Sequence, residues 1–150
     1  MKENKSSKTS KSSKTNKTKK TSKTTLAYLI VSGLVATAVG SFGLLDPAGY
    51  QLSNGAELHG QIALLNDIRG AGGGLLAIGL FVIFGSFSGY ARAATIVATT
   101  LCLGYGSARS ISLLVDGMPS ESLMFALGLE LLLGIAGLAL LYRERVHSAT

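Results

Sequence analysis

The chain of 150 residues has few of the groups that stabilise small secreted or metal-binding domains. It contains one cysteine, Cys102, two prolines and no tryptophan. One cysteine excludes an internal disulfide and a dithiol redox cycle, and no cysteine or histidine spacing is typical of a metal site. Charged residues are also scarce, at 15 %, whereas hydrophobic residues make up 47 %. This composition favours a membrane protein over a soluble globule, and Cys102 is expected to pack as a small hydrophobic residue.

The charges that do occur are concentrated at the N-terminus. Residues 1–25 contain nine lysines and one glutamate, so the rest of the chain holds five arginines and seven acidic residues. A segment with so few apolar residues cannot offset the entropy that folding costs, so we expect a disordered tail. Because no aromatic residue lies among the lysines, we expect no nucleic-acid partner. Contact with anionic lipid headgroups is the better expectation for this tail.

Four apolar runs follow the tail, and each is long enough to cross a hydrocarbon core, which takes about 20 helical residues. They are residues 26–45, 70–90, 93–115 and 122–142. Backbone groups in lipid must be satisfied within the segment, so each run predicts a helix. The expected fold is therefore an all-α, four-helix transmembrane bundle of up-down-up-down topology, in which residues 143–150 form a short tail.

The first run allows a second interpretation. The small-residue triplet Ala36-Thr37-Ala38 could end a cleaved secretory signal that follows the basic leader. The apolar run continues past this triplet to Leu45, which is span length rather than signal length. An uncleaved anchor is therefore the better expectation.

The basic residues that flank the runs predict the orientation of the bundle. The lysine tail, Arg92, Arg143 and Arg145 all fall on one side, which the positive-inside rule makes cytoplasmic. Both termini are then expected in the cytoplasm. The outer loop, residues 46–69, contains Asn54-Gly55, a pair typical of tight hairpin turns, so a small β-ribbon is expected there.

Small residues recur along each predicted span. Helices in lipid associate through close packing of such residues, because lipid tails are as apolar as leucine. The expected packing stripes are Gly33, Ala36 and Gly40; Gly70, Gly74 and Ala77; Ala98, Cys102 and Gly106; and Ala126, Gly134 and Gly137.

Two charged residues lie inside the third and fourth runs. Arg109 is six residues from the outer end of its run and Glu130 is eight residues from the outer end of its own. At about 1.5 Å per residue, both lie roughly 9 to 12 Å below the outer membrane boundary. A lone charge there costs at least about 2.5 kcal/mol. We therefore expect Arg109 and Glu130 to pair, since arginine can hold a carboxylate with two hydrogen bonds.

Further polar residues are expected near this pair. Arg69, at the lip of the second run, is long enough to bend inward toward it. The expected cluster comprises Arg69, Arg109 and Glu130, with Asn66, Asp67, Asp116 and Tyr105 close by. One interpretation is structural: a buried pair gives little net stability but can select one helix packing over others. The other is functional, with a partly neutralised arginine that receives an anionic or carbonyl-bearing ligand.

Three segments carry a family resemblance. They are LLNDIRGAGGGLLAIGLFVIFG, SARSISLLVDGMPS and LGLELLLG. They resemble a bacterial family of small four-span membrane proteins, domain-of-unknown-function family 4345, over about residues 26–142. The family's motif positions fall here on Asn66, Asp67 and Arg69; on Arg109; on Asp116, Gly117 and Pro119; and on Glu130. This chain departs from the pattern at Gly72, where many members carry an aromatic residue.

The resemblance implies a multi-pass protein of the bacterial plasma membrane and supplies no known activity. Family 4345 is also distantly similar to the quinone-linked DoxX-type membrane proteins.

A non-enzymatic membrane protein is the expected function class. The sequence offers no serine, histidine and aspartate set and no histidine within a span, so we expect no catalytic residue, no metal ligand and no cofactor. The charged cluster would bind a lipid-like or quinone-like molecule. Two alternatives remain. One is a small transporter or channel, which requires a homo-oligomer because four spans enclose only a narrow path. The other is a DoxX-like, quinone-linked oxidoreductase subunit.

Overall fold

The computed structural model describes residues 21–58 and 60–149. These residues form five α-helices and no strand: α1 (Lys23–Leu45), α2 (Pro47–Ser53), α3 (Ile62–Phe87), α4 (Ala91–Val115) and α5 (Glu121–Ala149). Most of the predicted disordered tail, residues 1–20, lies outside the described part of the chain. Residues 23–25, which we assigned to that tail, are helical. Ser22 caps α1, because its side-chain oxygen accepts a hydrogen bond of 3.1 Å from the backbone N–H of Thr25.

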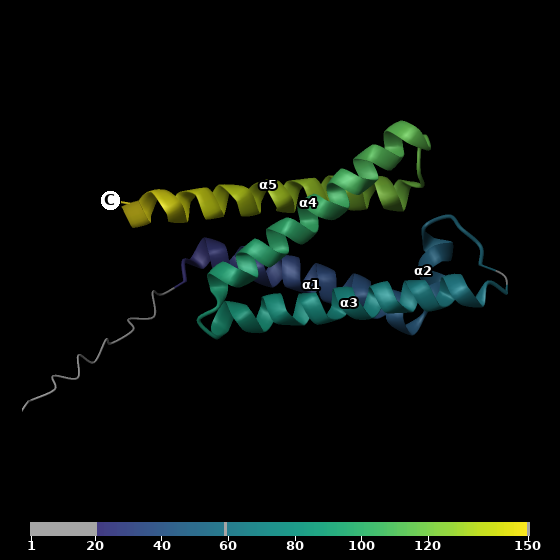
Figure 1. Cartoon of the computed structure of the whole chain (residues 1–150), viewed down its shortest axis with the longest axis horizontal. Helices are drawn as coiled ribbons and strands as arrows, with labels where there is room; N and C mark the ends of the chain where they lie inside the picture. The colour runs from purple at the N-terminus through teal and green to yellow at the C-terminus, as the bar shows by residue number, and fades with distance from the viewer. Residues whose placement is uncertain (1–20, 59, 150) are drawn as a thin grey trace, which may run out of the picture.

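The four long helices form a bundle in which consecutive long helices run in opposite directions (Figure 1). α1 packs mainly on α3, and α4 packs mainly on α5. In Figure 1, α1, α3 and α5 run roughly horizontally, whereas α4 crosses them diagonally. The start of α1 and the end of α5 lie at the same end of the bundle. The all-α class is therefore confirmed for the described residues.

Three of the long helices are apolar and long enough to cross a membrane. They are α1, α3 and residues Glu121–Val146 of α5. α4 is not among them, which differs from the four spans that we predicted. The reason is its composition, because α4 carries Arg109 together with several threonines and serines. Three helices are thus candidate membrane spans, and α4 requires a separate argument.

Several helix boundaries differ from the prediction. α3 begins at Ile62 rather than at residue 70, and α5 continues through the residues that we assigned to a C-terminal tail. The predicted β-ribbon is wrong, because a short helix, α2, occupies that part of the outer loop. Asp46 caps α2 by accepting a 2.9 Å hydrogen bond from the N–H of Gly49, and Pro47 fits the first helical position. These cap signals outweigh the Asn54-Gly55 turn signal.

Glycines allow α1 and α3 to approach closely. A Cβ atom built at Gly72 would lie 2.6 Å from the Leu44 nitrogen, and one built at Gly79 would lie 2.6 Å from the Thr37 nitrogen. Gly40 of α1 faces the same interface and would collide with the backbone of Leu76. The predicted stripe on α1 is thus confirmed at Gly40.

The predicted stripe on α3 is wrong. A Cβ atom at Gly70 or Gly74 would meet nothing within 4 Å. The face that contacts α1 carries Gly72 and Gly79 instead. Glycines at 70, 72, 73 and 74 cover most of the helix circumference, so the sequence alone left the packing face ambiguous.

The predicted stripes of α4 and α5 lie at the contact between these two helices. Gly137 of α5 also lies where they meet α1. Gly134 faces Leu103, and Gly106 faces Leu131. Gly137 leaves room for a contact between Tyr28 and Thr99, whose hydroxyl oxygens lie 3.2 Å apart. The Thr99 hydroxyl donates to the Thr95 carbonyl at 2.6 Å, so Tyr28 is the donor to Thr99. This buried bond joins α1 to α4.

Candidate functional site

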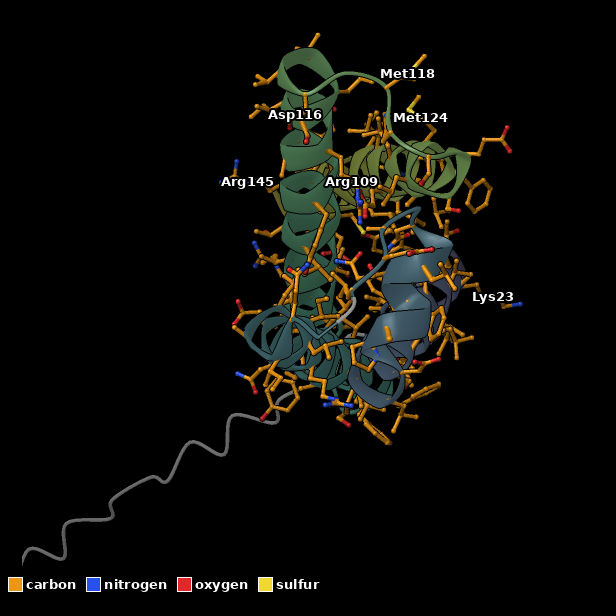
Figure 2. The ribbon with its side chains drawn as sticks, turned by 90° about the vertical axis from the view of Figure 1, so that its right-hand side faces the viewer. Lys23, Arg109, Asp116, Met118, Met124 and Arg145 are labelled. Carbon is orange, nitrogen blue, oxygen red and sulfur yellow. The ribbon has the colours of Figure 1, made fainter. Side chains whose placement is uncertain are left out.

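Arg109 of α4 and Glu130 of α5 form the ion pair that the sequence predicts. The Nε of Arg109 donates to both carboxylate oxygens of Glu130, at 3.1 Å and 3.0 Å. The side chains are 24 % and 20 % exposed, so the pair is half-buried. Figure 2 shows Arg109 pointing from α4 toward the interior of the bundle. The antiparallel packing of α4 on α5 brings the two residues to the same level.

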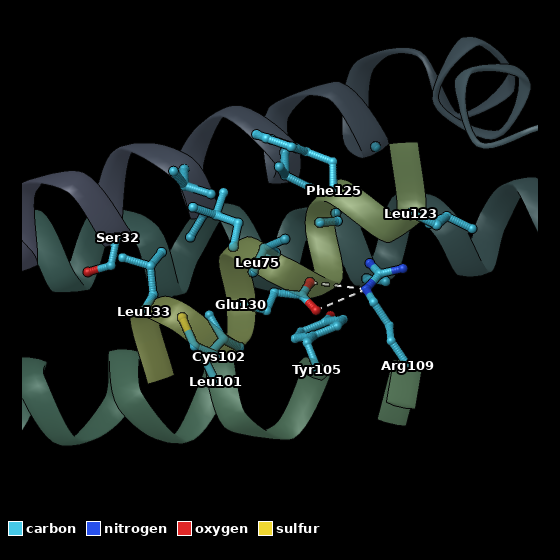
Figure 3. A pocket seen from close by; sticks show the side chains of 18 of the residues that line it. Ser32, Leu75, Leu101, Cys102, Tyr105, Arg109, Leu123, Phe125, Glu130 and Leu133 are labelled. Carbon is cyan, nitrogen blue, oxygen red and sulfur yellow. Dashed lines mark hydrogen bonds and ion pairs between the residues drawn. The ribbon is translucent and has the colours of Figure 1, made fainter. Parts of the chain in front are cut away.

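The geometry of this pair leaves part of the guanidinium free. Both hydrogen bonds to Glu130 use the single Nε–H group of Arg109. Within the described part of the chain, the two Nη atoms have no hydrogen-bond partner (Figure 3). A guanidinium carries five N–H donors, so Arg109 retains its Nη donors for another acceptor.

A cavity of about 380 Å³ lies beside the pair. All five helices contribute to its wall, which is mainly apolar. A volume of this size falls in the range of about 300 to 1,000 Å³ typical of ligand sites. The apolar lining residues are Val35, Ala36, Val39, Gly43, Ile68, Ala71, Gly72, Leu75, Val82, Ala98, Leu101, Cys102, Leu123, Phe125, Ala126, Leu129 and Leu133.

The polar groups of the cavity wall are few and are unevenly placed. Arg109, Glu130 and Tyr105 lie together along one part of the wall (Figure 3). Ser32 lies farther along the helices, next to Leu133 and Cys102, and its hydroxyl donates to the carbonyl of Tyr28 at 2.8 Å. The cavity is therefore an apolar space with one polar region.

Tyr50 and Asn54 of the α2 region and Ser122 of α5 line the end of the cavity near the outer loops. The hydroxyl of Ser122 donates to the carbonyl of Ser53 at 2.8 Å, and this bond connects α2 to the start of α5. Ser120, which precedes α5, has a buried hydroxyl without a hydrogen-bond partner in the described residues. The outer loops thus border the cavity at this end.

The larger charged cluster that we predicted is not formed. Arg69, Asn66 and Asp67 are exposed and do not line the cavity. They belong to the first two turns of α3, and the buried face of this helix passes through Ile68 and Gly72. Adjacent helical positions are about 100° apart, so the Arg69 side chain leaves the helix on another face.

Asp116 also lies away from the pair. It is exposed at the end of α4 (Figure 2), where a carboxylate oxygen accepts a 2.5 Å hydrogen bond from the hydroxyl of Ser112. Of the seven predicted site residues, the structure brings Arg109, Glu130 and Tyr105 together at the cavity. Arg69, Asn66, Asp67 and Asp116 are not part of this site.

The sequence did not single out the residues that α1 and α2 contribute to the cavity. Ser32, one of the polar residues in the first apolar run, gave a signal on α1. Tyr50 and Asn54 gave none, because their segment was expected to form a ribbon. Cys102 was expected to pack as a hydrophobic residue, and it is buried in the cavity wall.

Comparison with known proteins gives a family and no named relative. No curated protein and no solved structure matches this chain. A family model described as "Domain of unknown function (DUF4345)" matches residues 24–141, which include α2, α3 and α4, all but the first residue of α1, and most of α5. The chain therefore belongs to the DUF4345 family.

Proposed function

We propose that all four long helices cross the bacterial plasma membrane and that the cavity binds a lipid-like or quinone-like amphiphile without catalysing a reaction. For α4, the argument depends on its polar groups. The hydroxyls of Thr95, Thr99 and Ser110 donate to carbonyls of their own helix at 2.6 to 2.8 Å. Hydroxyls that are satisfied within a helix add little cost to crossing lipid, and Arg109 is paired with Glu130.

The arrangement of the helices supports the same number of crossings. α3 ends at one end of the bundle and α5 begins at the other, so α4 runs the length between them (Figure 1). With four crossings, the lysine tail, Arg92, Arg143 and Arg145 share one side, which is the cytoplasm. The tail then faces anionic lipid, to which each lysine near the surface adds about 1 kcal/mol of attraction.

The free Nη donors of Arg109 at the wall of an apolar cavity are the observation that carries the binding proposal. Ligand sites are typically apolar spaces in which a few polar groups fix the orientation of the ligand. The head of an amphiphile that accepts hydrogen bonds fits next to Arg109 and Tyr105, and its apolar part fits along Leu75 and Leu133. Glu130 balances the arginine charge, so an uncharged carbonyl acceptor is favoured over a free anion.

The wall of the cavity also supports binding rather than catalysis. It contains no histidine, and its only acid, Glu130, is held by Arg109. The nucleophile candidates are Ser32, whose hydroxyl donates to the carbonyl of Tyr28, and Cys102, and the one acid of the wall is engaged by Arg109. The side chains of the cavity wall therefore support a binding protein. The bilayer is the source of its ligand.

Native mass spectrometry of the protein extracted from its membrane tests this proposal. We expect a bound amphiphile with at least one carbonyl or phosphoryl acceptor on the wild type, and about tenfold lower occupancy in Arg109→Lys, which keeps the positive charge but loses the Nη fork. Arg69→Lys is the matched control, because Arg69 is exposed outside the cavity. Equal occupancy in all three proteins, or an empty wild-type protein, would contradict the proposal.

A further inference from the structure

A second hollow lies on the outer surface of the bundle, between α3 and α4. Its volume is about 610 Å³, and it is lined by Ile78 of α3 and by α4 residues that include Ile96, Thr100 and Gly104. We refer to it as the α3–α4 groove. No charged side chain lines it. It therefore offers nothing to a charged, water-soluble ligand.

The groove and the internal cavity share part of their walls. Leu101 and Tyr105 of α4 line both hollows. Tyr105 is 40 % exposed although it lines the internal cavity, so its side chain stands between the inside of the bundle and its surroundings. Leu101 and Tyr105 therefore lie on the boundary between the two spaces.

The crossing of α4 over α3 explains why the helices are open here. Near the end of α3 the two helices are close, since a Cβ atom built at Gly85 would lie 3.2 Å from the Cβ of Ala94. Farther along, α4 runs diagonally away from α3 (Figure 1). Gly104, on this diverging part, has open space next to it. The groove occupies the widening angle between the two helices.

We propose that the α3–α4 groove is a lateral entrance through which a hydrocarbon chain of a bilayer lipid passes, between Leu101 and Tyr105, into the cavity. This inference rests on the proposed binding function and adds to it the origin and the route of the ligand. The ligand is a molecule dissolved in the membrane, and it enters sideways from the bilayer instead of from water. Its head reaches Arg109, one helical turn beyond Tyr105 on α4.

The shape of the cavity suits such a chain. The lining runs from Ser32 to Gly43 on α1 and from Ser122 to Leu133 on α5, a length of about 16 Å at a rise of ~1.5 Å per residue. The wall along this length is mainly apolar, and its charged groups, Arg109 and Glu130, lie together on one part of it. An elongated apolar space with one polar region matches a molecule that has a hydrocarbon chain and a polar head.

A fluorescence experiment can follow entry directly, because the chain contains no tryptophan. Leu129→Trp places a single fluorophore at the cavity wall, and Phe84→Trp places one on the exposed surface of α3. The protein in vesicles is mixed rapidly with the methyl ester of stearic acid that carries a nitroxide quencher on its chain, because this probe has an uncharged carbonyl acceptor. Phe84→Trp reports arrival of the probe in the bilayer, and Leu129→Trp reports its later, saturable entry into the cavity.

Gly104→Leu is the decisive variant, because a leucine there fills the groove without touching the cavity wall. An obstructed entrance slows passage and leaves the bound state unchanged. We therefore expect Gly104→Leu, in the Leu129→Trp background, to slow cavity quenching about fivefold or more with the same final amplitude. Tyr105→Ala widens the passage and is expected to accelerate entry. Gly74→Leu is the matched control, since Gly74 also faces open space but lines neither hollow.

The outcomes separate this inference from the proposed function. Saturable quenching with an unchanged rate in Gly104→Leu would overturn the entrance and leave the binding site intact. Absence of saturable quenching in the wild-type background would overturn both. Native mass spectrometry that shows fewer copies per particle in Gly104→Leu than in Gly74→Leu would make the groove a subunit interface and would overturn the entrance.

Discussion

Arg109 and Glu130 place opposite charges among apolar side chains of two neighbouring helices. Each charge would be costly without the other, since a central membrane position penalises a lone arginine or acid by at least about 2.5 kcal/mol. Their contact at 3.0 Å removes most of this penalty. The pair therefore explains how α4 can carry an arginine and still pack inside the bundle.

A double-mutant cycle tests the energetic coupling of these two residues. Arg109→Leu and Glu130→Leu are each expected to lower the free energy of unfolding by about 2 kcal/mol, because each leaves an unpaired charge in an apolar place. The double variant should cost less than the sum by at least about 1 kcal/mol. Unfolding in mixed detergent and denaturant micelles measures all three values.

Arg69→Leu provides the control for this cycle. Arg69 is exposed and belongs to α3, so its replacement should change the free energy of unfolding by no more than about 0.5 kcal/mol. Additive losses in the Arg109 and Glu130 variants would argue against direct pairing. A large loss in Arg69→Leu would restore the extended cluster that the sequence suggested.

At the level of the helices, the close packing of α1 against α3 depends on glycines, which have no side chain. Gly72 of α3 lies against the backbone of Gly40, Gly43 and Leu44. Even a Cβ atom at position 72 would be 2.8 Å from the carbonyl carbon of Gly43. Close backbone approach replaces the side-chain contact, and it gives the dense packing that holds helices together in lipid.

Alanine substitutions at Gly72 and Gly74 are expected to have different effects on the stability of the protein. Gly72→Ala should destabilise the protein by about 1 to 3 kcal/mol, because its methyl group forces α1 and α3 apart. Gly74→Ala should be neutral or stabilise by up to about 1 kcal/mol, because alanine favours the helix and space is open. Thermal denaturation in detergent compares the two variants. Equal effects would mean that α1 does not pack on the Gly72 face of α3.

At the scale of the whole molecule, the start of α1 and the end of α5 lie on the same side of the membrane only if α4 also crosses it. Three crossings would put the two ends of the chain on opposite sides, and four put them together. The same end of the bundle contains the start of α1 and the end of α5 (Figure 1). Whether α4 crosses the membrane can therefore be tested by finding on which side each end of the chain lies.

Reporter fusions answer that question. Green fluorescent protein fused after Thr150 should fluoresce, because the C-terminus is expected in the cytoplasm, where the reporter folds. Alkaline phosphatase fused after Gly60, in the loop between α2 and α3, should be active, because that loop is expected outside. Phosphatase activity at the C-terminus, together with activity at Gly60, would show that α4 does not cross.

The sequence by itself determined the helical class, the order of the long helices and the pairing of Arg109 with Glu130. These features depend on local composition and on spacing along the helix axis, and a linear sequence records both. A charge in an apolar helix needs a partner at equal depth, and only one acid in the neighbouring run satisfied this condition. The small-residue stripes on α1, α4 and α5 followed from the same regular spacing.

The tertiary structure alone decided which face of α3 meets α1, and hence that Arg69 points away from the pair. Five of the six residues from 69 to 74 are small, so local spacing did not define that face. Only the close approach of the α1 backbone selected Gly72 and Gly79. The sequence did not predict the cavity either, because residues from five separate helices border it. Helix depth can be counted along a chain, but rotation and crossing angle depend on contacts between residues far apart in it.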